Sequence, residues 1–123
     1  MSEFDANIPI YLQIMHSIKQ SIVTGVLKPG DKLSSVRDQA EALSVNPNTV
    51  QRAYQELERE GVSETKRGMG TFIVEKQTLI ADLRSEMAKS VMETFIEGMK
   101  ALGFAGKAVI EALEKEIDGG NNR

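Results

Sequence analysis

The sequence predicts a mainly α-helical protein with one small β-hairpin, and three observations support that prediction. Apolar residues recur at helical spacing in several separate stretches of the chain. Two short helical stretches are joined by a tight turn at Ser44-Val45, so their apolar sides must pack into one common core. Two strand-like segments then flank the glycine-rich turn Arg67–Gly70. Helix, turn, helix and hairpin in this order predict a winged helix-turn-helix fold.

The size and composition of the chain restrict its class. A length of 123 residues suits one domain, or a small domain with an appendage. Hydrophobic residues make up 41% and charged residues 27%, which are ordinary values for a soluble globular protein. Because no apolar run is long enough to span a bilayer and the first residues do not resemble a signal peptide, we expect a cytoplasmic location. The absence of cysteine excludes a disulfide framework and a thiolate metal site.

The first two helices are predicted from proline, glycine and capping residues. Pro9 suits a first helical position, and the helix is expected to run to about Thr24. Its apolar stripe contains Tyr11, Ile14, Met15, Ile18 and Ile22. Gly25 ends this helix, and the following VLKPGDKL segment is expected to be a loop. Ser35 and Asp38 resemble a capping box for a short second helix, whose buried side is Val36, Ala40 and Leu43.

The third helix has the clearest start and the most informative polar face. Asn46 is a suitable N-cap and Pro47 a suitable first residue. Its apolar positions follow helical spacing at Val50, Ala53, Tyr54 and Leu57. The opposite face contains Asn48, Arg52, Gln55 and Arg59, with Gln51 and Glu56 beside it. Arginine, asparagine and glutamine can bond base edges in the major groove, so this face predicts DNA recognition.

The hairpin after Gly61 is predicted to be a wing. Its strands are expected at Val62–Lys66 and Thr71–Glu75. The two glycines of the turn permit a positive φ and a close approach to a neighbouring surface. With Lys66 and Arg67 at the tip, that surface is expected to be a DNA backbone or minor groove. The alternative is that both charges only keep an edge strand soluble.

The last part of the chain predicts two helices with an uncovered apolar side. A long helix is expected from about Thr78, and Gly103 separates it from a shorter one. The apolar stripe of the long helix includes Leu83, Met87, Val91 and Phe95, to which we assign dimerisation. Two helices alone leave apolar surface exposed, and a second copy of the chain is the simplest cover. The expected organisation is a DNA-binding domain over 8–76, a helical dimerisation segment over 77–118 and a flexible tail over 119–123.

Several strings together resemble the GntR family of bacterial transcription regulators, with a short C-terminal part like that of its YtrA-like subfamily. The matching strings are PIYLQI, GVLKPGDKL, SVRDQA, VNPNTVQRAYQELEREG and TKRGMGTFIV, followed more weakly by LGFAGKAVIEALEKEI. The resemblance implies a homodimeric repressor on a two-fold palindromic operator in double-stranded DNA, commonly beside a transporter operon. It leaves room for a small-molecule effector, which the sequence does not identify.

The resemblance also implies which residues contact DNA. They are Arg37 at the start of the second helix, then Asn46, Asn48, Thr49 and Arg52 around the third, and Lys66, Arg67, Gly68 and Gly70 in the wing. The sequence departs from the family pattern at Ser63, where an apolar strand residue is usual. A less firmly packed wing is therefore expected.

Two other functional classes remain to be weighed against a DNA-binding regulator. An enzyme is not supported, because the chain has no nucleophile–base pair, phosphate loop or metal constellation, and no cofactor is expected. A protein-binding adaptor stays open because the charge of the predicted module is balanced. Between Lys28 and Lys76 there are eight basic and eight acidic residues, a net charge of zero. If the module binds DNA, the placement of its charges must matter more than their sum.

Overall fold

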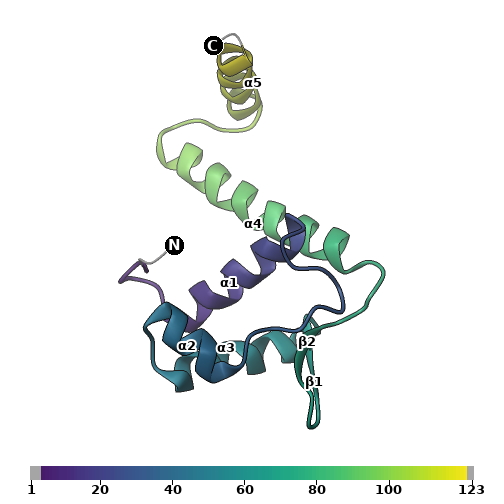
Figure 1. Ribbon diagram of the computed structural model, residues 1–123. Helices are drawn as coiled ribbons and strands as arrows, with labels where there is room; N and C mark the ends of the chain where they lie inside the picture. Colours follow the sequence, from purple (N-terminus) through teal and green to yellow (C-terminus); the bar gives the residue numbers. More distant parts are fainter. Residues whose placement is uncertain (1–3, 122–123) are drawn as a thin grey trace. The chain divides into compact units, whose positions relative to one another are not determined.

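The computed structural model describes residues 4–121, which form five helices and one two-stranded antiparallel sheet (Figure 1). The helices are α1 (Ile10–Val23), α2 (Val36–Leu43), α3 (Pro47–Arg59), α4 (Leu79–Ala101) and α5 (Lys107–Asn121). The strands are β1 (Ser63–Lys66) and β2 (Gly70–Ile73). The predicted fold class, a winged helix-turn-helix followed by two further helices, is confirmed. The chain divides into two compact units, one ending at Arg84 and the other beginning at Ser85.

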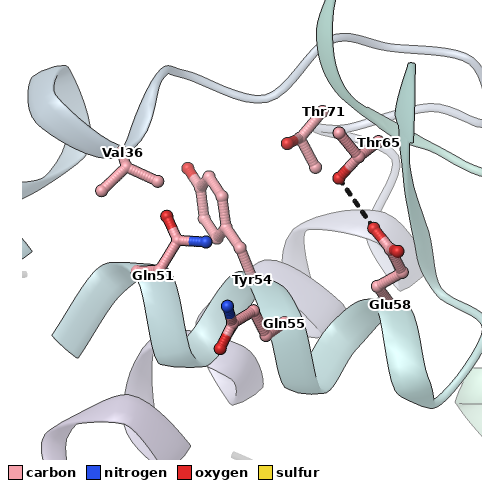
Figure 2. A pocket seen from close by; sticks show the side chains of 7 residues that line it. All are labelled: Val36, Gln51, Tyr54, Gln55, Glu58, Thr65 and Thr71. Atoms are coloured by element: carbon pink, nitrogen blue, oxygen red, sulfur yellow. Dashed lines mark hydrogen bonds between the residues drawn. The ribbon is translucent and has the colours of Figure 1, made fainter. Parts of the chain in front are cut away.

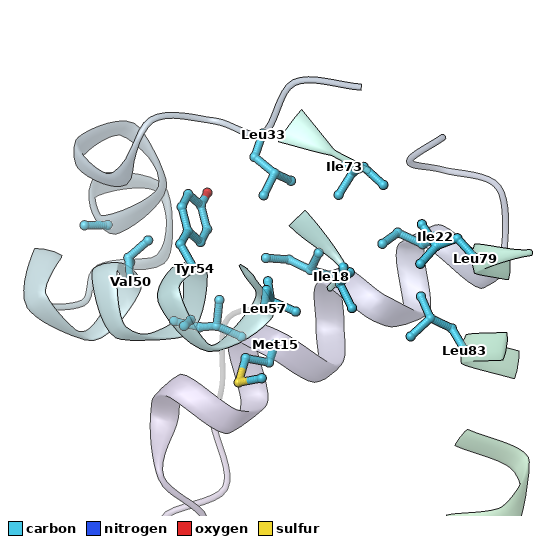
Figure 3. Packing of buried hydrophobic residues seen from close by; sticks show 14 residues of the cluster. Met15, Ile18, Ile22, Leu33, Val50, Tyr54, Leu57, Ile73, Leu79 and Leu83 are labelled. Carbon is cyan, nitrogen blue, oxygen red and sulfur yellow. The ribbon is translucent and has the colours of Figure 1, made fainter. Parts of the chain in front are cut away.

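The core of the first unit is formed mainly by α1 and α3, as Figure 3 shows. Buried side chains of α1 are Ile14, Met15, Ile18 and Ile22, and those of α3 are Val50, Ala53, Tyr54 and Leu57. These are the positions expected from the helical periodicity of the sequence. Since α3 buries one side against α1 and α2, its other side is available to a partner.

The start of α2 and the turn between α2 and α3 contain the caps that the sequence predicts. Ser35 Oγ accepts a hydrogen bond from the backbone N of Asp38 at 3.0 Å and so caps α2. Ser44 ends α2 in the left-handed region, with φ at 56°. Asn46 Oδ1 then accepts from the backbone N of Asn48 at 2.8 Å and caps α3. The chain therefore reverses over very few residues, which fixes α2 against α3.

The wing contains more backbone pairing than the sequence predicts. Its two strands pair from Ser63 opposite Ile73 to Lys66 opposite Gly70. The segment 30–33, expected to lie within a loop, pairs along the free edge of β2. Gly30 N donates to the carbonyl of Ile73 at 2.9 Å, and Leu33 N donates to the carbonyl of Thr71 at 2.8 Å. The segment is a loop as predicted except for one isolated bridge, between Lys32 and Phe72, which the sequence does not predict. Backbone groups far away in the sequence complete the hydrogen bonds of this loop.

The boundary of the first unit lies later than expected. The first turns of α4 belong to it, since Leu79 and Leu83 are only 3% and 4% exposed and lie in its core. Arg84 Nη2 also donates to the carbonyl of Val23 at 3.3 Å, at the end of α1. The expected division after residue 76 therefore separates residues that pack together.

The second unit, described to residue 121, has an apolar surface of its own. On α4 the exposed apolar residues are Val91, Met92, Phe95 and Ile96, and on α5 they are Ile110, Leu113 and Ile117. The helix α5 continues to Asn121, so the expected tail is wrong for residues 119–121. Neither Gly119 nor Gly120 adopts the positive φ that commonly ends a helix; residues 122–123 lie outside the described part. No helix among residues 4–121 is long and apolar enough to cross a membrane.

Ser63 is the one side chain of the described part whose buried oxygen has no hydrogen-bond partner. It is 2% exposed and lies opposite Ile73 in the sheet. A buried hydroxyl without a partner costs about 1–3 kcal/mol. Ser63→Val is therefore expected to raise the free energy of unfolding by about 1 kcal/mol, because it removes this cost and suits a strand. Urea unfolding at one fixed protein concentration measures the change.

Ser63→Ala serves as the matched control, because it removes the hydroxyl without adding volume. A gain with alanine alone would indicate that valine is too large for the site. A loss of stability with both variants would contradict the prediction, since it would mean that the hydroxyl is hydrogen-bonded in solution.

Candidate nucleic-acid interface

A polar groove separates α3 from the wing. It has a volume of about 400 Å³ and is lined by Val36, Gln51, Tyr54, Gln55, Glu58, Thr65 and Thr71. Figure 2 shows Gln51, Gln55 and Glu58 on α3, with the two threonines of the hairpin beyond Glu58. One edge of a helix and one side of a hairpin therefore present amide and hydroxyl groups to the same space.

Two hydrogen bonds fix the walls of this groove. The hydroxyl of Tyr54 donates to the carbonyl of Ser34 at 2.8 Å, which joins α3 to the segment before α2. Burial raises the pKa of Tyr54 to about 12, so the hydroxyl keeps its proton and remains a donor at neutral pH. Thr65 Oγ1 donates to Glu58 Oε1 at 2.7 Å and joins β1 to the end of α3 (Figure 2). The helix and the wing are thus held in a defined relation.

The three predicted contact residues at the start of α3 differ in what they can offer. Asn46 already uses its side-chain oxygen as the helix cap, so only its amide hydrogens are free to donate. Asn48 is exposed, whereas Thr49 is half-buried. An exposed amide side chain in the first turn of α3 is suited to a base edge or a phosphate.

The two arginines predicted to contact DNA have different surroundings. Arg37 is exposed on α2, and its side chain makes no hydrogen bond or ion pair with any residue of the described part. Arg52 is also exposed, but its guanidinium carbon lies 3.9 Å from the ring centroid of Tyr11 on α1. This cation–π contact holds Arg52 against α1. Arg52 does not line the groove beside the wing, whereas Gln51 and Gln55 do.

The tip of the wing has the backbone conformation that its glycines predict. Gly68 and Gly70 have φ values of 79° and 120°, and Met69 N donates to the carbonyl of Lys66 at 2.8 Å to close the turn. Lys66 Nζ lies 4.7 Å from the ring centroid of Phe72. Arg67 is exposed and forms no ion pair within residues 4–121. Two cationic side chains therefore lie next to each other at the start of a turn that has no side chain at Gly68 and Gly70.

The ion pairs of the first unit show which basic side chains have a carboxylate partner. Acidic side chains pair with basic ones that lie elsewhere: Lys19 with Glu60, Arg59 with Glu56 at 3.1 Å, and Lys76 with Asp82 at 3.2 Å. Arg37, Lys66 and Arg67 have no carboxylate partner among the described residues. Positive charge without a carboxylate partner is therefore present on α2 and at the wing tip, although the charges of the module sum to zero.

Three residues at or beside this surface were not assigned a role from the sequence. Gln51 was placed only at the flank of the polar face, Tyr11 only in the apolar stripe of α1, and Lys32 in a loop. The helical angle of Gln51 was available from the sequence, but the position of the wing beside it was not. Among residues 4–121, no cluster of histidine and carboxylate side chains is arranged to hold a metal ion.

Comparison with known proteins identifies the family. The family model described as bacterial regulatory proteins, gntR family, matches residues 10–73, which span α1 to the end of β2. The chain is 44% identical to the uncharacterized HTH-type transcriptional regulator YhcF of Bacillus subtilis, over 97% of this chain and 98% of the relative. It is 47% identical to the HTH-type transcriptional repressor YtrA of Bacillus subtilis, over 72% of this chain and 68% of the relative.

A solved structure extends the similarity to the fold of almost the whole chain. A GntR family transcriptional regulator from Listeria monocytogenes superposes with a TM-score of 0.82 at 45% identity, covering 91% of this chain and 98% of that one. The relatives are named as transcriptional regulators and not as enzymes. The chain therefore belongs to the gntR family of bacterial regulatory proteins, as a DNA-binding transcription regulator of the helix-turn-helix type.

Proposed function

We propose that this regulator is a homodimeric repressor that binds an inverted-repeat operator in double-stranded DNA. The observation that supports the proposal most directly is the distribution of paired and unpaired charge. Lys19, Arg59 and Lys76 form ion pairs with carboxylates, whereas Arg37, Arg52, Lys66 and Arg67 on the proposed DNA-facing surface form none. Unpaired positive charge beside a helix rich in amide groups fits a DNA strand, because the charges can bind its phosphates and the amides its bases.

The proposed division of roles follows the position of each residue. α3 enters the major groove, where Asn48 and Gln51 present exposed amides to base edges. Arg37 approaches the same groove from α2, and Asn46 and Thr49 contact the backbone beside the start of α3. The face of the Arg52 guanidinium lies on the ring of Tyr11, so Arg52 would donate hydrogen bonds to DNA from the edge of the guanidinium. Lys66, Arg67, Gly68 and Gly70 bring the wing tip against the backbone or minor groove.

The proposed dimer uses the second unit. Met87, Val91 and Phe95 from the predicted stripe are half-buried or exposed in the single chain, and α5 adds Ile110, Leu113 and Ile117. Leu83 is left out of the interface because it is buried within the first unit of its own chain. Two copies related by a two-fold axis would present two α3 helices to two half-sites of a palindrome.

Repression follows from the relationship to YtrA, which is named as a repressor. The family resemblance further suggests an operator beside a transporter operon, and a small-molecule effector that releases it. The first test is a mobility-shift titration with the intergenic DNA next to the gene, in competition with unrelated DNA of equal length. Binding that prefers an inverted repeat in that fragment supports the proposal. Equal binding to all fragments, or none, would favour a protein-binding adaptor.

Lys66→Ala tests the role of the wing. The variant is expected to bind all DNA sequences more weakly by the same factor, because a phosphate contact carries no sequence information. The slope of log affinity against log salt should become shallower by about 1. Lys100→Ala, which removes the same charge from α4, is the control and should leave the slope unchanged. A loss of affinity confined to one operator position would instead show that Lys66 reads a base.

A further inference from the structure

We propose that Lys32 is an additional phosphate-binding residue of the wing, a role that rests on the DNA binding proposed above. Lys32 lies in the segment that pairs with the free edge of β2. Leu33 N donates to the carbonyl of Thr71, and Ile73 N donates to the carbonyl of Asp31, both at 2.8 Å. Lys32 and Phe72 therefore face each other between two hydrogen bonds as bridge partners. Side chains of such an antiparallel pair lie close together on the same side of the sheet.

Gly70 makes room for the side chain of Lys32. A Cβ atom at Gly70 would lie 2.8 Å from Cε of Lys32 and 3.5 Å from its Nζ. Real Cβ contacts of 2.8 Å essentially do not occur, so in this conformation the end of the Lys32 side chain lies in the space that a Cβ at Gly70 would occupy. Gly70 is opposite Lys66, the last residue of β1 before the turn. The stem of Lys32 thus extends toward the tip of the wing, and its ammonium group lies beside the turn.

The ammonium groups of Lys32 and Lys66 lie on one face of the sheet. Phe72 is the partner of Lys32 in one pairing, and its ring also contacts Lys66 Nζ at 4.7 Å. Glu64 is paired with Phe72 in the sheet and therefore lies on the same face, yet its carboxylate forms no ion pair with either lysine. Lys32 itself is exposed and has no ion-pair partner among residues 4–121. Two ammonium groups without a carboxylate partner create a positive potential suited to a polyanion.

DNA phosphate is the ligand that this placement favours. Lys32 comes from the segment before α2, whereas Lys66 comes from β1, so two separate parts of the chain would hold the backbone on the same face of the wing. Gly70, which is expected to contact DNA itself, has a φ of 120° that favours glycine, and a Cβ there would displace the end of the Lys32 side chain.

The test is a salt titration of operator binding with full-length Lys32→Gln, which removes the charge and retains most of the stem. The slope of log affinity against log salt is expected to become shallower by about 0.9. Between 50 and 200 mM salt, the loss of affinity should therefore be smaller than in wild type by a factor of about 3 to 4. Lys32→Arg should keep the wild-type slope, because it keeps the charge. Equal melting temperatures show that the variants are folded.

Lys28→Gln is the matched control, because Lys28 is exposed in the same loop but precedes the paired segment. It should keep the wild-type slope. An unchanged slope in Lys32→Gln, with wild-type operator binding intact, would overturn the role of Lys32 and leave the proposed function standing. Equal changes in both variants would mean that only net charge matters, which also overturns it. If Lys32→Gln lost affinity only at one base pair of the operator, the role of Lys32 in phosphate binding would also be overturned. If the wild-type protein bound DNA without sequence preference, both proposals would be overturned.

Discussion

Replacing Val91 and Phe95 with glutamate is expected to convert the protein to monomers and to abolish tight operator binding. Both side chains lie on the second unit, where Val91 is 68% and Phe95 37% exposed in the single chain. Glutamate in an apolar interface must be buried without a partner, which opposes association. A monomer contacts one half-site, and linked binding at two sites can exceed single-site affinity by about 10²–10⁴-fold. Light scattering and operator titration measure the two effects.

Lys89→Glu provides a control with the same change in net charge. Two neutral residues replaced by glutamate change the charge by −2, and one lysine replaced by glutamate also changes it by −2. Lys89 is exposed and lies well away from the Val91 and Phe95 stripe around α4, given 100° per residue. This variant should remain dimeric. Unchanged dimers in the double glutamate variant would place the interface elsewhere, for example on the exposed side of α5 alone.

The elements of the first unit were largely predictable because their signals are local. Asn46 and Pro47 mark the start of α3 by capping chemistry, and the buried side of that helix follows from its periodicity. The glycines at the wing tip likewise predict the positive φ values that the turn adopts. Each of these signals depends on residues within a few positions of one another.

The features that the sequence did not reveal depend on residues far apart in the chain. The pairing of Lys32 with Phe72 joins segments separated by the whole of α2 and α3. The position of Leu83 in the apolar stripe of α4 is compatible with a core residue and with an interface residue. Only its burial in the structure shows that it belongs to the core. The stacking of Arg52 on Tyr11 requires α1 and α3 to lie side by side. Periodicity assigns a side chain to a face, but it does not identify what covers that face.

Arg37→Ala and Arg52→Ala are each expected to weaken operator binding by about 1–3 kcal/mol, roughly 5- to 150-fold. Neither arginine is part of the apolar core, so neither substitution opens a cavity. Arg37→Ala should keep the melting temperature of wild type, because Arg37 has no partner among the described residues. Arg52→Ala should lose up to about 1 kcal/mol of stability, because the contact with Tyr11 disappears. Operator titrations and thermal unfolding separate the two quantities.

Operator variants then decide what each arginine contacts. An arginine that bonds a base should lose discrimination at one base pair of each half-site, and both half-sites of a dimer should respond alike. An arginine that bonds phosphate should weaken binding to every sequence by the same factor and reduce the salt dependence instead. Tyr11→Phe retains the ring beneath Arg52 and should bind as wild type, whereas Tyr11→Leu should approach the loss of Arg52→Ala. Wild-type affinity in either alanine variant would remove that arginine from the interface, and an unfolded variant would show that its role is structural.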